Sequence, residues 1–106
     1  MTRSALIQYE KKKIQKLAKE YKSKGYRIFV NLPHYHSPYP IKKFVPDMIV
    51  QKGNKKIIIE VKTKRSLKKR REAMECFALY ARKRPKFRFD VFISNPRSSI
   101  SKSNRK

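Results

Sequence analysis

The stretch FVPDMIVQKGNKKIIIEVKTK, residues 44–64, constrains the fold more than any other part of the chain. Two apolar runs, residues 44–51 and 55–63, are joined across Lys52, Gly53 and Asn54. Apolar runs of this length around a Gly-Asn turn are typical of a β-hairpin. The second run is the most apolar segment of the chain, so we expect it at the centre of a sheet.

Helical periodicity and strand patterns on either side of the hairpin complete the expected fold. Residues 4–24 carry apolar residues at helical spacing before Gly25, and residues 26–33 are rich in β-forming residues. Ser66 is expected to cap a second helix that runs to about residue 84, before a strand over residues 86–94. This order predicts an α/β domain with a mixed sheet of about four strands flanked by two helices.

The charge of the chain indicates a polyanionic partner. Thirty Lys and Arg residues stand against seven acidic ones among 106 residues, which gives a formal net charge of +23. Nucleic acid screens such a charge well, with DNA as the leading partner and RNA not excluded. The length predicts one domain, residues 1–96, followed by a basic flexible tail, residues 97–106.

The apolar content argues against a membrane partner. No run of eighteen apolar residues and no signal-peptide core is present in the sequence. We therefore expect a cytoplasmic, organellar or nucleoid-associated protein that is not secreted.

Each strand of the expected hairpin carries one acidic residue, Asp47 and Glu60, where a core strand normally keeps an apolar one. An unpaired carboxylate there costs several kcal/mol, so a functional role is favoured over a surface ion pair. Glu60 and Lys62 project from one face of their strand, and the hairpin brings Asp47 alongside. Two neighbouring carboxylates suit a hard cation such as Mg²⁺, with Mn²⁺ as an alternative. With Lys62 to orient or deprotonate a water, they predict a phosphodiester hydrolysis site.

Pro46-Asp47 followed by Glu60-Val61-Lys62 resembles the PD-(D/E)xK nuclease superfamily, which includes restriction endonucleases, archaeal Holliday-junction resolvases and small cyanobacterial relatives. The resemblance covers roughly residues 4–95. It implies a restriction-endonuclease-like core and a Mg²⁺-dependent deoxyribonuclease that acts as a homodimer. It also implies that Asp47, Glu60 and the Val61 carbonyl bind the metal and that Lys62 is the catalytic lysine.

Many members of that superfamily add a glutamate from the first helix, and this chain offers two candidates. Resemblance favours Glu20, which precedes the Lys24-Gly25-Tyr26 turn. The helical wheel favours Glu10, which falls within the apolar face of the helix. Both alternatives stay open at this point.

The expected nucleic-acid-binding surface is basic and partly aromatic. Tyr35 and Tyr39 lie in a proline-bounded loop before Lys42 and Lys43, a composition that suits contacts to bases and phosphates. In the same loop, His34 and His36 are expected to be exposed contacts rather than metal ligands. A second group of cations follows the predicted site directly and is expected to hold the phosphate backbone: Lys64, Arg65, Lys68, Lys69 and Arg70.

Two functions from different classes remain. Asp47, Glu60 and Lys62 favour a metal-dependent endonuclease. The charge of +23 favours a non-catalytic, nucleic-acid-binding component of a larger DNA or RNA assembly built on the same fold, because an enzyme must release its product.

Overall fold

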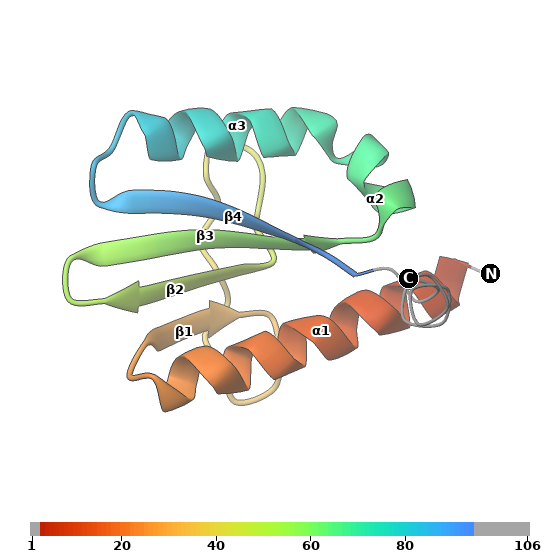
Figure 1. Cartoon of the computed structure of the whole chain (residues 1–106), viewed down its shortest axis with the longest axis horizontal. Coiled ribbons are helices and arrows are strands. Elements are labelled where there is room, and N and C mark those ends of the chain that lie inside the picture. Colours follow the sequence, from red (N-terminus) through yellow and green to blue (C-terminus); the bar gives the residue numbers. More distant parts are fainter. Residues whose placement is uncertain (1–2, 95–106) are drawn as a thin grey trace, which may run out of the picture.

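A four-stranded mixed sheet lies between helices in the computed structural model (Figure 1). The structure describes residues 3–94, with side chains described from residue 9, so the predicted tail at residues 97–106 lies outside the described part. No helix in the described part has the length and apolar content needed to cross a membrane. The elements in chain order are α1 (Arg3–Ser23), β1 (Arg27–Val30), β2 (Met48–Lys52), β3 (Lys55–Lys62), α2 (Lys64–Lys69), α3 (Arg71–Arg82) and β4 (Phe87–Ile93).

The sheet has the order β1-β2-β3-β4, and the predicted hairpin forms its centre. β1 pairs with β2 and β2 with β3 in antiparallel fashion, whereas β3 and β4 are parallel neighbours. The hairpin closes over Gly53 and Asn54, with Gly53 at a φ of 60°, a conformation that favours glycine. Helices α2 and α3 connect the two parallel strands. The predicted α/β class with a mixed four-stranded sheet is therefore confirmed.

The two faces of β3 contribute to two separate hydrophobic cores. Leu17 of α1 packs in one core with Ile59 and Val61. Phe77 of α3 is fully buried in the other, with Ile58. Because side chains alternate along a strand, α1 and α3 cover opposite faces of the sheet, as Figure 1 shows. Glu60 and Lys62 share the face of Ile58, which is the α3 side.

The strand predicted from residue 44 begins only at Met48. Phe44 instead pairs with Ile41 through two backbone hydrogen bonds of 2.8 and 3.1 Å. Pro46 is buried and has no N–H with which to continue the ladder. Asp47 consequently lies immediately before β2 rather than inside it.

The first strand is also shorter than predicted, ending at Val30 rather than residue 33. There the chain turns back, because Leu32 N–H donates to the Val30 carbonyl at 2.9 Å and Val30 N–H donates to the His36 carbonyl at 2.7 Å. Residues 31–36 therefore fold back beside β1 instead of extending the strand.

The predicted cap at Ser66 and the single second helix are both wrong. Thr63 is the N-cap of α2: its hydroxyl accepts from Ser66 N–H at 3.1 Å, and the Ser66 hydroxyl accepts from Thr63 N–H at 3.0 Å. This is a capping box in which Ser66 is the third helical residue. The helix then breaks at Arg70, whose φ and ψ of −105° and 15° separate α2 from α3.

Candidate active site

At the end of the β2–β3 pairing, the carboxylates of Asp47 and Glu60 accept hydrogen bonds from backbone N–H groups. Asp47 N–H donates to Glu60 Oε2 at 2.8 Å, and Val61 N–H donates to Asp47 Oδ2 at 2.8 Å. Buried backbone N–H groups require acceptors, and here carboxylate oxygens supply them where Pro46 ends regular pairing. Asp47 and Glu60 are thus fixed side by side at the end of the sheet.

Lys62 and Arg70 form ion pairs with these carboxylates. Lys62 Nζ lies 3.0 Å from Asp47 Oδ2 and 3.7 Å from Glu60 Oε1. On the other side, Arg70 Nη2 lies 3.2 Å from Glu60 Oε1 and also donates to the Val45 carbonyl at 3.1 Å. We call Asp47, Glu60, Lys62 and Arg70 the charged quartet. Its two positive and two negative groups balance, which explains how two carboxylates persist so close together.

Burial of the quartet is uneven. The Glu60 side chain is completely buried, the Lys62 side chain is 10% exposed, and that of Asp47 is 20% exposed. Desolvation by burial is the main cause that raises the pKa of Glu60, and the charge of Asp47 raises it further. Lys62 and Arg70 oppose this shift. Asp47 is therefore the carboxylate that presents itself to solvent, while Glu60 supports it from the interior.

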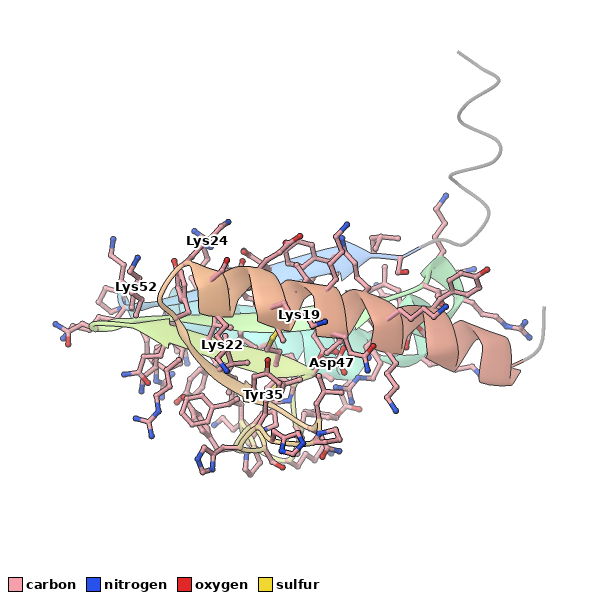
Figure 2. All side chains as sticks on the ribbon, turned by 90° about the horizontal axis from the view of Figure 1, so that it is seen from below. Lys19, Lys22, Lys24, Tyr35, Asp47 and Lys52 are labelled. Atoms are coloured by element: carbon pink, nitrogen blue, oxygen red, sulfur yellow. The ribbon has the colours of Figure 1, made fainter. Side chains whose placement is uncertain are left out.

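A cavity of about 380 Å³ opens beside Asp47 on the side of α1. It lies between α1, the end of β1 and the segment before β2, and we call it the Asp47 pocket. Figure 2 shows Asp47 next to α1 in this region. The residues lining it are Glu10, Lys11, Ile14, Val30, Asn31, Leu32, Val45, Pro46 and Asp47.

Glu10, rather than Glu20, is the helix glutamate that the fold brings to this region. The Glu10 carboxylate lines the Asp47 pocket, accepts a hydrogen bond from Thr63 N–H at 2.9 Å and accepts another from the Ser66 hydroxyl. Glu20 is exposed near the other end of α1, and the ten-residue separation corresponds to about 15 Å along the helix. The structure therefore places Glu10 at the Asp47 pocket and Glu20 away from it, while a role of either residue in metal binding stays a prediction.

The oxygen donors near Asp47 fit a hard divalent cation in type. Among the described residues, no three carboxylate, imidazole or thiol groups gather closely enough to hold a metal ion. Mg²⁺ commonly uses only one or two protein carboxylates, with waters and substrate phosphate completing the set. Asp47 and Glu60 supply two such groups. Because Val61 N–H points toward Asp47, the Val61 carbonyl faces the same strand edge and adds a third oxygen.

The predicted phosphate-binding residues divide into two groups. Four are exposed on α2, next to the charged quartet: Lys64, Arg65, Lys68 and Lys69. In the loop before β2, Lys42 is exposed at a φ of 59°, whereas Lys43 lies 3.5 Å from Glu72 in an exposed ion pair. Arg70 has a different partner, since its guanidinium binds Glu60. Sequence reasoning missed this role, because nothing distinguishes Arg70 within a run of cations.

The two loop tyrosines lie on opposite sides of the sheet. Tyr35 packs against the core on the α1 side, while Tyr39 stacks edge-on against Phe29, which belongs to the α3 side. His34 and His36 are both exposed. The tyrosines therefore do not form one aromatic surface.

The family model described as AHJR-like, REase_AHJR-like, matches residues 2–106. That description names a restriction-endonuclease-like family, and the match extends over almost the whole chain. No curated protein matches the chain significantly, and no solved structure does so either.

Proposed function

The chain belongs to the AHJR-like family of restriction-endonuclease-like proteins, and from this premise we propose that it is a metal-dependent endonuclease that hydrolyses DNA phosphodiester bonds. The single observation that carries the proposal is the pairing of Asp47 with Lys62 at 3.0 Å beside a cavity. A carboxylate that can hold a metal ion, a lysine that can orient a water and open space for a phosphate suit metal-assisted hydrolysis.

Each member of the pair has a role in this reaction. Asp47 and Glu60, with the Val61 carbonyl, would hold Mg²⁺ or Mn²⁺, which would supply a Lewis acid for the scissile phosphate. Lys62 orients the attacking water toward the phosphorus atom. The oxygen of that water forms a new P–O bond and gives up one proton to solvent while the ester P–O bond breaks, and the departing alkoxide takes up one proton from solvent.

The surface charge supplies substrate binding in the same proposal. Lys64, Arg65, Lys68 and Lys69 are exposed beside the quartet and can neutralise phosphates near the cut. A site that cuts one strand serves two strands when two chains pair, so we extend the proposal to a homodimer or a subunit of a nucleoprotein complex. RNA is a second substrate class that the same charge would bind.

One observation favours a second function, a non-catalytic nucleic-acid-binding component of a larger assembly. Lys62 and Arg70 already neutralise the two carboxylates, so the quartet is complete without a metal ion. Together with a net charge of +23, this arrangement also suits a protein that stays bound to nucleic acid.

A cleavage assay with matched variants separates the two functions. Purified protein is incubated with labelled linear, nicked and four-way-junction DNA in Mg²⁺ or Mn²⁺, beside Asp47→Asn, Lys62→Met and Asp90→Asn. Asp90 is the matched control, because it is a partly exposed aspartate paired with Arg88 away from the site. DNA binding and thermal unfolding are measured for every variant.

We expect Asp47→Asn and Lys62→Met to lose cleavage by about a hundredfold or more while they retain DNA binding. Asp90→Asn should cut at the rate of the unsubstituted protein. Tight binding with no cleavage of any substrate in either metal contradicts the enzyme and leaves the nucleic-acid-binding component.

A further inference from the structure

A second cavity, of about 260 Å³, lies along α1 next to the Asp47 pocket. Gln15 and Lys19 of α1 form one wall, and Leu32, Pro33 and Tyr35 form the other. We call it the Tyr35 pocket. Leu32 also lines the Asp47 pocket, so the two cavities are neighbours along the same helix.

The aromatic wall of this pocket is held in place by its backbone. Tyr35 N–H donates to the Leu32 carbonyl at 3.2 Å, and the His36 carbonyl accepts from Val30 N–H at 2.7 Å. His34, which lies between Leu32 and Tyr35 in the chain, has a φ of 72°. This left-handed conformation costs a residue with a side chain about 1–2 kcal/mol. Such conformations persist only where neighbouring interactions determine them. The position of Tyr35 is therefore preorganised.

The surroundings of the pocket are cationic. Lys22 Nζ lies 5.7 Å from the centre of the Tyr35 ring, and none of the five lining residues is acidic. Figure 2 shows Lys19 and Lys22 beside Tyr35, with Asp47 on one side of them and Lys24 and Lys52 on the other. The pocket thus combines an aromatic wall with exposed cations close to the candidate active site.

This combination suits a nucleotide whose base is not paired. Proteins bind single strands by stacking bases on aromatic side chains while cations follow the backbone. In a duplex, stacked neighbours cover the faces of each base, so a ring such as that of Tyr35 can stack only on an unstacked one. The volume is below the roughly 300–1,000 Å³ of pockets for drug-sized ligands, which matches a single planar group.

We propose that the Tyr35 pocket binds an unpaired nucleotide of the DNA strand that passes the Asp47 pocket. The base stacks on Tyr35, and the adjoining phosphates contact Lys19 and Lys22. Lys19 lies nine positions after Glu10 on α1, or about 14 Å along the helix, a distance that a few nucleotides of a single strand can span. Binding of this nucleotide does not depend on the proposed nuclease function, and only the position of the cut relative to it does.

Binding measured without divalent metal tests the pocket independently of cleavage. Fluorescence anisotropy in EDTA compares a blunt duplex with the same duplex that carries a single-stranded extension of about eight nucleotides. Tyr35→Leu removes the ring and keeps an apolar side chain in the core. Tyr80→Leu is the matched control, because Tyr80 is a half-buried tyrosine of α3 that packs edge-on against Phe87 on the other face of the sheet.

We expect Tyr35→Leu to weaken binding of the extended duplex about five- to a hundredfold, the range for one stacked base, with no change for the blunt duplex. Tyr80→Leu should leave both affinities unchanged. Lys22→Gln should lower the slope of log affinity against log salt by about 0.7 for the extended duplex. Lys83→Gln, an equal charge change just after α3, should leave that slope unchanged.

A photocrosslinking experiment locates the contact. With 5-iodouracil placed at successive positions of the extension, one position should crosslink to Tyr35. The proposal is overturned if Tyr35→Leu and Tyr80→Leu behave alike, if the blunt duplex loses as much affinity as the extended one, or if no position crosslinks to Tyr35.

Failure of the proposed function gives a different result. In that case no metal supports cleavage, yet the selective effect of Tyr35→Leu in EDTA persists. Conversely, cleavage that depends on Asp47 without any selective effect of Tyr35→Leu overturns the pocket and leaves the nuclease.

Discussion

Replacing Arg70 with Met tests whether its guanidinium neutralises the buried carboxylate of Glu60. Arg70 Nη2 lies 3.2 Å from Glu60 Oε1, and the Glu60 side chain is completely buried. After the substitution, Lys62 at 3.7 Å is the cation of the quartet that remains beside Glu60. Lys62 is also shared with Asp47, so the Glu60 charge is left poorly compensated.

The expected loss of stability follows from this geometry. Removing one partner of a buried ion pair costs about 3–5 kcal/mol. The Arg70 side chain is 30% exposed and Lys62 stays in place, so we expect a smaller loss of stability, about 2–3 kcal/mol. For a domain of this size, that loss lowers the melting temperature by roughly 10–20 °C.

The neighbouring Arg71 provides the matched control. Its side chain is 84% exposed and lies 3.6 Å from Glu75 on the surface of α3, so Arg71→Met should cost only about 0.3–0.5 kcal/mol. Combining Arg70→Met with Glu60→Gln removes the buried charge as well and should restore at least about 1 kcal/mol. Urea and thermal unfolding in EDTA provide the measurements. Equal melting temperatures for Arg70→Met and Arg71→Met, or strict additivity in the double variant, refute the reasoning.

Two further predictions concern pH and a turn. Because the pKa of Glu60 is raised above 4.5 in the folded protein, its contribution to stability is complete below pH 4.5 and is lost as the pH rises through the folded value. In EDTA, the urea concentration at the midpoint of unfolding of the unsubstituted protein should therefore fall relative to that of Glu60→Gln as the pH rises toward 7. A rise relative to Glu60→Gln contradicts the raised pKa of Glu60. Gly53→Ala should cost about 1 kcal/mol and lower the melting temperature by about 4–8 °C, because φ is +60° and no atom lies within 4 Å of the added Cβ. An unchanged melting temperature contradicts this prediction and shows that the backbone at residue 53 moves to accommodate alanine.

Local patterns were sufficient for the sheet and for part of the site. The Gly-Asn turn fixes the pairing of β2 with β3, and that pairing brings Asp47 to Glu60 in any fold that keeps the hairpin. The break at Arg70 and the early end of β1 were missed, because each depends on contacts made after the chain folds back. The cap at Thr63 is an exception, since Thr-x-x-Ser before the helix resembles a capping box in the sequence itself.

The sequence by itself determined the mixed α/β sheet, the strongly basic character and the motif Pro46-Asp47 with Glu60-Val61-Lys62. These follow from periodicity, turn chemistry and charge, which are properties of short segments. The tertiary structure alone decided that Glu10 rather than Glu20 lines the Asp47 pocket, that Arg70 binds Glu60 and that Tyr35 and Tyr39 separate. Such choices depend on how helices and loops pack across the sheet, and residues distant in sequence meet only after that packing is complete.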